Sequence, residues 1–131
     1  MKLHHVGIAV NSLQASIPIF EKLLGHGPES EEIVEDQKVR IASFDAGDSQ
    51  IELLEATSPD SPIARFIEKR GQGLHHLTLA VPDLVKALAE LESSGFKLID
   101  RKPRTGAGHE SIAFVHPSGT VNVLIELVET K

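Results

Sequence analysis

Residues 4–10 read HHVGIAV and residues 75–81 read HHLTLAV. The chain has 131 residues and only seven histidines, yet four of the seven form these two adjacent pairs. Each pair opens a run in which bulky and small residues alternate, and a period of two is typical of a β-strand with one buried face. The two stretches therefore predict two equivalent strands, with His5 and His76 at equivalent positions.

A second repeated motif follows each of these strands at a similar distance. IELLE occupies residues 51–55 and IELVE occupies residues 125–129. Between the histidine pair and this second motif, each half contains a helix-like stretch that ends near a glycine. A unit of about 65 residues that occurs twice explains both the repeated histidine pair and the repeated glutamate motif, because repeats at a fixed spacing indicate a repeated supersecondary structure. We expect a single domain over 1–131, built from module one at 1–56, a linker at 57–73 and module two at 74–131.

Each module is expected to contain a strand, a helix and two or three further strands, which gives an α+β fold. Ser12 is a suitable helix N-cap and Gly25 a suitable helix end in module one. For module one we expect a strand at 4–10, a helix from 12 to 25, a short strand within EEIVEDQ and a hairpin of 38–45 and 49–55. For module two we expect a strand at 75–81, a helix at 83–94 and strands near 96–100, 111–116 and 121–129. The linker should carry a short amphipathic helix.

The composition excludes several classes of function. The absence of cysteine rules out disulfides, thiolate metal sites and a thiol nucleophile, and it fits a reducing cytoplasm, where we expect the protein. The net charge of −6, without a run of lysine or arginine, argues against a nucleic-acid partner. The sequence shows neither a signal peptide nor an apolar stretch approaching the roughly 20 residues of a membrane span, so we expect no membrane partner.

The alternation in each strand predicts which way the histidines point. One face of the first strand carries bulky aliphatic residues that we expect to pack on the helix, and His5 lies on the other face beside small residues. His76 is placed in the same way in the second strand. In the motifs IELLE and IELVE, Glu52 and Glu126 alternate with inward-facing aliphatic residues, so they also point to the open face of the sheet.

Two modules related by a pseudo-twofold axis would bring His5, Glu52, His76 and Glu126 together. Two neutral imidazoles and two carboxylates form a mixed nitrogen and oxygen donor set, which suits Zn, Mn, Co, Ni or Fe rather than an all-oxygen calcium site. A lone strand histidine or glutamate more often has no such role, so the prediction rests on four equivalent positions in a repeat. The remaining partners of the pairs, His4 and His75, should face the helix or the strand mouth and have a structural or supporting role.

Three stretches also resemble a known family. HHVGIAV, the block from IELLEATSPDSPIARFIEKRGQGLHHLTLAV and AFVHPSGTVNVLIEL look like the methylmalonyl-CoA epimerase family, in the vicinal oxygen chelate (glyoxalase/bleomycin resistance/dioxygenase) superfamily. The resemblance covers nearly the whole chain. It implies two tandem βαβββ modules whose curved sheets form a cupped mixed sheet around a divalent ion such as Co, Mn, Ni or Zn, and it favours a homodimer.

Carried over residue by residue, the resemblance implies the same four metal ligands, His5, Glu52, His76 and Glu126. It also implies an isomerase that interconverts the (2R) and (2S) forms of methylmalonyl-CoA, a small-molecule acyl-CoA substrate. The C2 proton lies between a thioester and a carboxylate, so its removal creates an enolate that a metal ion stabilises. Glu126 matches a metal-bound glutamate of the family to which one of the proton-transfer roles is assigned, and we take it as the candidate catalytic residue.

The second acid or base does not match the family pattern. Some members carry a glutamate on the preceding strand, where our alignment places Ile41. The partner of Glu126 could be Glu52 or a bound water, and the sequence leaves this open. The turn HPSGTVN also departs from the family form, and the basic, glycine-rich loop KPRTGAGHE at 102–110 is a candidate contact for the acyl group or coenzyme A, with Lys102 and Arg104 as candidate phosphate contacts.

Two other functions are also compatible with the sequence. A glyoxalase-like isomerase or an extradiol-type dioxygenase would use the same scaffold, and two histidines with one carboxylate form the iron triad of such oxygenases. Against a dioxygenase, Glu52 fills a fourth position and the chain has no tyrosine. A non-catalytic protein that binds a small molecule would have no need for four ligand-type residues, and the chain has few aromatic residues to line its cup.

Overall fold

The computed structural model describes residues 1–130, which form two compact units. The first unit is His5–His75, and the second joins residues 1–4 to the residues from 76 onward. The principal elements, in chain order, are β1 (Lys2–Ala9), α1 (Leu13–Leu24), β2 (Ser30–Val34), β3 (Val39–Asp45), β4 (Gln50–Ala56), α2 (Pro62–Arg70), β5 (Gly73–Val81), α3 (Leu84–Ser93), β6 (Arg104–Thr105), β7 (Ser111–Val115) and β8 (Ile125–Glu129). Two βαβββ modules, β1-α1-β2-β3-β4 and β5-α3-β6-β7-β8, are therefore confirmed, and the fold is α+β.

The strands of each unit follow the same order. In the first unit the order is β2-β3-β4-β1, and in the second it is β6-β7-β8-β5. The first strand of each module pairs in parallel with the last strand, β1 with β4 and β5 with β8, whereas the remaining neighbours are antiparallel. Each unit therefore contains a mixed four-stranded sheet, and the parallel pair brings the histidine strand beside the glutamate strand.

Local sequence accounts for the ends of helix α1. Ser12 has an extended backbone, and its side-chain oxygen accepts a hydrogen bond from the backbone N–H of Ala15 at 3.1 Å. Gly25 ends the helix in the left-handed region with φ of 85°, a conformation that costs glycine little. The helix predicted between these two residues is confirmed. Asp83 begins α3 in the same way, by accepting from the N–H of Lys86 at 3.0 Å.

A glutamate on the last strand of each module also anchors the start of that module's first helix, α1 or α3. The N–H of Leu13, the first residue of α1, donates to Glu55 Oε1 at 2.6 Å. The N–H of Leu84, the first residue of α3, donates to Glu129 Oε2 at 3.0 Å. The first residues of a helix have no N–H partner within the helix, so each glutamate stabilises a helix start and links it to the sheet. The final glutamates of IELLE and IELVE therefore have a structural role.

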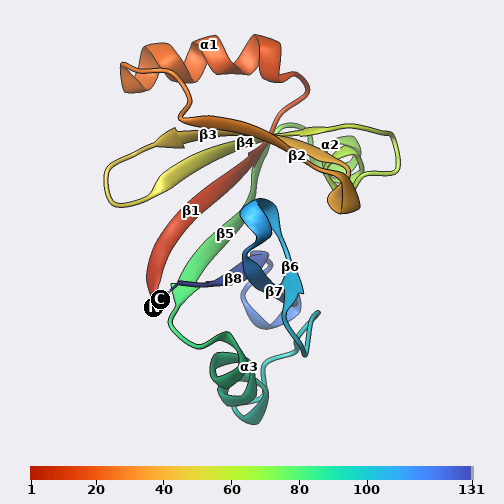
Figure 1. Cartoon of the computed structure of the whole chain (residues 1–131). Helices are drawn as coiled ribbons and strands as arrows, with labels where there is room; N and C mark the ends of the chain where they lie inside the picture. Colours follow the sequence, from red (N-terminus) through yellow and green to blue (C-terminus); the bar gives the residue numbers. More distant parts are fainter. Residues whose placement is uncertain (131) are drawn as a thin grey trace. The chain divides into compact units, whose positions relative to one another are not determined.

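Helix α1 covers one face of the sheet of the first unit (Figure 1), and α3 packs on one face of the sheet of the second unit. The core of the first unit joins α1 to β3 and β4, with Leu13, Phe44 and Leu53 buried in it. The core of the second unit joins α3 to β7 and β8, with Leu84 and Leu127 fully buried. These residues lie on the faces that alternation predicted, and the histidines lie on the opposite faces.

The structure differs from the prediction at three points of the second module. Residues 96–100 do not form a regular strand and contribute only an isolated bridge from Leu98 to β7. The N–H groups of Ile99 and Asp100 both donate to the carbonyl of Phe114, and the Asp100 side chain accepts from the N–H of Phe114 at 2.8 Å. The side chain thus takes the place of a backbone partner, and the ladder is interrupted.

The other two corrections concern the neighbours of β7. Strand β6 is only two residues long and was not predicted, since it lies within the loop at 102–110. Strand β8 begins at Ile125 rather than at 121, because Val121 and Asn122 have positive φ values of 49° and 68°. Such residues form a turn and cannot continue an extended strand.

The segment between the modules contains the short helix that its amphipathic pattern predicted. Helix α2 begins after Ser61, whose side chain accepts from the N–H of Ile63 at 3.1 Å, and it buries Ile63. Strand β4 and α2 are in contact within the first unit. The module boundaries at 56 and 74 stay a prediction. Among the described residues no helix is long and apolar enough to cross a membrane.

Candidate metal and active site

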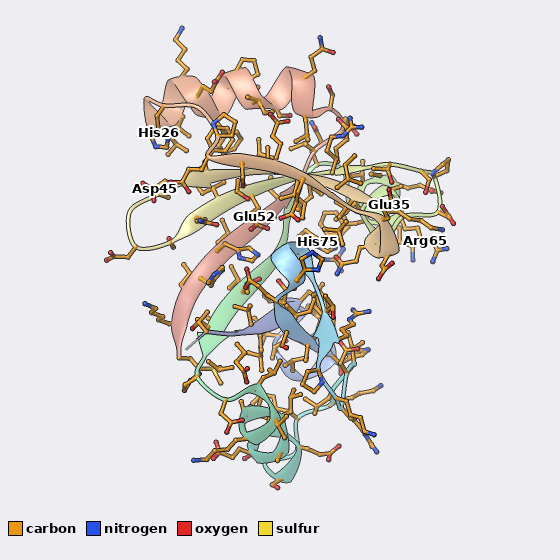
Figure 2. The ribbon with its side chains drawn as sticks, in the orientation of Figure 1. His26, Glu35, Asp45, Glu52, Arg65 and His75 are labelled. Atoms are coloured by element: carbon orange, nitrogen blue, oxygen red, sulfur yellow. The ribbon has the colours of Figure 1, made fainter. Side chains whose placement is uncertain are left out.

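The first unit holds a buried histidine–carboxylate pair. Strand β1 carries His5 and strand β4 carries Glu52, and the parallel register sets Gly7 opposite Glu52. Nε2 of His5 lies 3.2 Å from Oε1 of Glu52, and both residues are less than a tenth exposed. In Figure 2 the side chain of Glu52 leaves β4 on the side away from α1. The pair therefore lies on the open face, where the sequence placed both residues.

The second unit repeats this arrangement. Strand β5 carries His76 and strand β8 carries Glu126, with Nε2 of His76 at 3.5 Å from Oε1 of Glu126. The parallel register sets Thr78 opposite Glu126. His76 and Glu126 are each 8% exposed, so burial is the same as in the first unit. The equivalence inferred from the sequence repeat holds at the level of single atoms within each unit.

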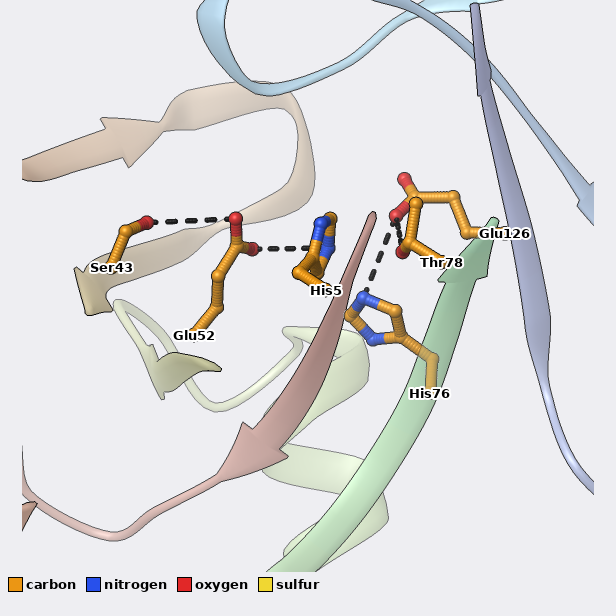
Figure 3. A network of polar contacts seen from close by, with 6 residues as sticks. All are labelled: His5, Ser43, Glu52, His76, Thr78 and Glu126. Atoms are coloured by element: carbon orange, nitrogen blue, oxygen red, sulfur yellow. Dashed lines mark hydrogen bonds and ion pairs between the residues drawn. The ribbon is translucent and has the colours of Figure 1, made fainter. Parts of the chain in front are cut away.

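Each carboxylate also contacts a hydroxyl, and here the two units differ (Figure 3). In the first unit the hydroxyl of Ser43, on β3, lies 3.5 Å from Oε2 of Glu52. In the second unit the hydroxyl of Thr78, on β5, donates to Oε1 of Glu126 at 2.5 Å. The Thr78 bond has the length of a charge-assisted O–H···O⁻ hydrogen bond, whereas the Ser43 contact is at the limit of hydrogen bonding.

The donor atoms of each pair are spaced as two ligands of one ion would be. Divalent ions hold imidazole nitrogen and carboxylate oxygen at about 2.0–2.2 Å, so two ligands about 90–110° apart are roughly 3.0–3.5 Å from one another. The separations of 3.2 Å in one unit and 3.5 Å in the other fall in this range. The same separations also allow an ion pair between imidazole and carboxylate without a metal. The residues therefore fit a divalent ion both in chemistry and in spacing.

Aromatic and basic side chains flank the pair in the second unit. The ring of Phe114 meets the ring of His76 edge-on, with centroids 6.4 Å apart. The guanidinium of Arg104 lies 5.0 Å from the centre of the Phe114 ring, and its Nε is 3.4 Å from Oδ2 of Asp100. Phe114 pairs with Glu126 across β7 and β8, so the Phe114 ring lies between the Arg104 cation and the histidine–carboxylate pair in this series of contacts.

The loop at 102–110 is held close to the open face of the second unit. Strand β6 pairs with β7, and the N–H of Gly106 donates to the carbonyl of Glu110 at 2.8 Å. A Cβ atom at Gly106 would lie 2.6 Å from the side chain of Ile112, which is closer than real Cβ contacts. Ile112 belongs to a small apolar cluster with Ala80 and Val128. The glycine lets the loop rest on this cluster.

The structure also places the other histidine of each pair and Ile41. The His75 ring packs edge-on against the Phe66 ring of α2, with centroids 5.0 Å apart. His4 is partly buried. Their expected supporting role stays a prediction. Ile41, which occupies the position aligned with a family glutamate, is 5% exposed and pairs with Leu54 on β4, so this aligned position offers no acid or base.

Sequence reasoning missed the hydroxyl contacts of Thr78 and Ser43. Thr78 was treated only as a small neighbour of His76, although its hydroxyl on the ligand face was a usable signal. Ser43 gave no comparable signal, because only the β3–β4 register sets it opposite Glu52. The contacts of Asp100 and Arg104 with Phe114 were likewise hidden, since they depend on the irregular path of residues 96–105.

Comparison with known proteins supports the resemblance inferred from the sequence. The model of the Glyoxalase/Bleomycin resistance protein/Dioxygenase superfamily matches residues 4–114. The uncharacterized protein YqjC of Bacillus subtilis is 44% identical over 130 residues, which cover 99% of this chain and 93% of that protein.

Two solved structures extend the comparison to the fold. The crystal structure of methylmalonyl-CoA epimerase from Mycobacterium tuberculosis is 38% identical and superposes with a TM-score of 0.93, over 99% of this chain and 88% of that one. A variant of Streptomyces coelicolor methylmalonyl-CoA epimerase in complex with 2-nitronate-propionyl-CoA is 31% identical, with a TM-score of 0.92 over 99% of this chain and 94% of that one. The chain belongs to the Glyoxalase/Bleomycin resistance protein/Dioxygenase superfamily.

Proposed function

We propose that this chain is a metal-dependent methylmalonyl-CoA epimerase, an isomerase that interconverts the (2R) and (2S) forms of its substrate. The observation that carries the proposal is the buried histidine–carboxylate pair that occurs at equivalent positions in both units. The names of the solved relatives from Mycobacterium tuberculosis and Streptomyces coelicolor support the choice of reaction and of an acyl-CoA substrate.

The proposed metal ligands are His5, Glu52, His76 and Glu126, acting together on one divalent ion. The support is chemical: two imidazoles and two carboxylates suit Co, Mn, Ni or Zn, and the choice among these metals is open. When bound, the ion supplies positive charge that stabilises the negative charge developing on the substrate. The burial of all four residues supports this use, because electrostatic interactions are stronger away from water.

The reaction itself requires a proton to leave C2 on one face and another to arrive on the opposite face. We assign one of these transfers to the Glu126 carboxylate. Glu52 and a water molecule are the two candidates for the other transfer, since Ile41 has no titratable group. General acid–base groups must lie within hydrogen-bonding reach of the proton they move, and a carboxylate on the open face meets this condition for a substrate bound there.

Exchange of the C2 proton with solvent tests the reaction directly. Purified protein loaded with Co²⁺ is incubated with methylmalonyl-CoA in heavy water, and the C2 proton signal is followed by NMR. We expect loss of this signal at a rate that depends on protein and on metal. No exchange above the metal-only control would refute the epimerase proposal and would favour another reaction or a binding role on the same scaffold.

Arg104 is the proposed anion contact of the substrate, with Lys102 beside it in the loop at 102–110. The position of its guanidinium over the Phe114 ring, which in turn contacts the His76 ring, supports this role. Arg104→Gln should raise KM for the acyl-CoA several-fold and leave kcat nearly unchanged, because it removes binding that is uniform along the reaction. An unchanged KM would exclude Arg104 as a substrate contact.

We further propose that the protein is a cytoplasmic homodimer. The absence of cysteine supports a reducing compartment, and the family resemblance supports the dimer. Light scattering coupled to size exclusion measures the mass in solution, which should be twice the chain mass of 14.2 kDa. A mass equal to one chain over a range of concentrations would refute the dimer.

A further inference from the structure

The two modules differ at one position on the strand that carries the histidine. Two residues after His5 the chain has Gly7, and two residues after His76 it has Thr78. Both positions lie opposite the glutamate of the neighbouring strand, Glu52 or Glu126, in the parallel register. Only the second module therefore has a side chain at this position that can reach its glutamate.

Thr78 is placed to hold the carboxylate of Glu126 in one orientation. The side chain is completely buried, and its hydroxyl donates to Oε1 of Glu126 at 2.5 Å. The same oxygen lies 3.5 Å from Nε2 of His76. Threonine is stiff about χ1 because it is β-branched, so a buried threonine hydroxyl presents a nearly fixed donor to the carboxylate.

Ser43 offers the matching contact in the first module, and that contact is weak. Its hydroxyl lies 3.5 Å from Oε2 of Glu52 and reaches it from β3 on the other side of β4. Hydrogen bonds between oxygen atoms have a usual length of about 2.7–2.8 Å and weaken as they lengthen. The hydroxyl contact of Glu126 is therefore much shorter than that of Glu52, although the repeat makes the backbone positions of the two glutamates equivalent.

We propose that Thr78 is a positioning residue that orients Glu126 for binding the divalent ion. The proposal rests on the metal site proposed above. A ligand already held in place loses less conformational freedom when it binds, and partners that orient metal ligands typically contribute about 10- to 100-fold in metal affinity. Thr78 makes Glu126 the preorganised carboxylate of the site, and Ser43 contributes much less to Glu52.

Titration of the metal-free protein with Co²⁺ by calorimetry tests this role. Thr78→Val keeps the shape and removes the hydroxyl, so its Kd for Co²⁺ should rise about 10- to 100-fold. Thr78→Ser keeps the hydroxyl and should recover most of the affinity. Ser43→Ala is the matched control in the first module, and its Kd should change less than about three-fold because the contact it removes is long. The visible spectrum of bound Co²⁺ should change in Thr78→Val and stay close to wild type in Thr78→Ser.

The urea midpoint of each metal-free variant separates positioning from folding. A Thr78→Val protein that loses stability but binds Co²⁺ like wild type would overturn the proposal, and so would equal losses of affinity in Ser43→Ala and Thr78→Val. Failure of Thr78→Ser to restore affinity would also overturn it. If the wild-type protein binds no Co²⁺, the proposed metal site itself is refuted. If wild type and Thr78→Val both bind Co²⁺ normally, only the positioning role of Thr78 is refuted.

Discussion

The two modules contain the same pair of ligand-type residues but support them differently. In each module a parallel strand pair sets a histidine beside a glutamate, and a glutamate three residues further on anchors the helix. The hydroxyl next to the carboxylate comes from β3 in one module and from β5 in the other. The shared strand register thus gives both modules the same histidine–glutamate pair, whereas the hydroxyl-bearing residues around the pair differ.

The largest expected effect concerns the two histidines. If the pairs of both modules serve one ion, His5→Ala and His76→Ala should each abolish Co²⁺ binding and lower C2 exchange by at least about 100-fold, because a metal supplies several kcal/mol of charge stabilisation. Calorimetry and NMR exchange measure these two quantities. Full retention of both in either variant would show that its module contributes no ligand.

The next effect concerns the anchoring carboxylates. Glu55→Ala and Glu129→Ala should each lower the free energy of unfolding by about 0.5–2 kcal/mol, since a helix N–H loses its acceptor. Glutamine keeps an acceptor oxygen, so Glu55→Gln and Glu129→Gln should be less destabilising. Urea denaturation monitored by circular dichroism gives the midpoints. A loss of stability on substitution of only one of the two glutamates would show that the two anchors are not equivalent.

A third and smaller effect on stability is expected in the turns that precede β4 and β8, the strands that carry Glu52 and Glu126. The β3–β4 turn has Gly47 at φ of 85°, whereas the turn before β8 has Val121 at φ of 49°. A β-branched residue is strained in this region and glycine is not. Val121→Gly should therefore raise the free energy of unfolding by about 1 kcal/mol, and Gly47→Val should lower it by at least as much.

Thermal and urea unfolding of these two variants measure the difference. Val121 is 88% exposed, and a Cβ at Gly47 would have no heavy atom within 4 Å. Packing therefore contributes little at either position, and the backbone conformation dominates. A Val121→Gly protein less stable than wild type would contradict the strain argument.

The smallest effect is the pH dependence of one exposed contact in the first unit. A hydrogen bond from Lys38, and to a lesser extent one from Ser58, lowers the pKa of Asp60 from 3.8 to about 2. A lowered pKa means that the folded state favours the charged carboxylate, so its stabilisation is present above the ordinary pKa and is lost as the pH falls toward 2. Since the carboxylate is exposed to solvent, salt should screen the effect.

Asp60→Asn isolates this contribution. The difference in urea midpoint between wild type and Asp60→Asn should be constant above about pH 5 and should shrink as the pH approaches 2. The same difference should be smaller in high salt. A difference that grows on acidification would have the wrong sign and would exclude the contact with Lys38 as its cause.

Much of the fold could be predicted from local pattern. The ends of α1 follow from Ser12 and Gly25, because capping depends on neighbouring residues only. The irregular path of 96–100 could not be predicted, because it depends on the Asp100 side chain accepting a bond from Phe114, which is remote in sequence. Regular elements follow from periodicity, whereas interrupted ladders depend on particular contacts across strands.

The sequence by itself determined which face of each sheet the four proposed ligand residues share. Strand alternation and the repeat were sufficient to place His5, Glu52, His76 and Glu126 on open sheet faces, because side chains alternate with a strict period of two. Only the tertiary structure decided which hydroxyl meets which carboxylate. Strand register brings Thr78 to Glu126 at hydrogen-bonding distance and leaves Ser43 further from Glu52, and register between strands remote in the chain is a property of packing rather than of local sequence.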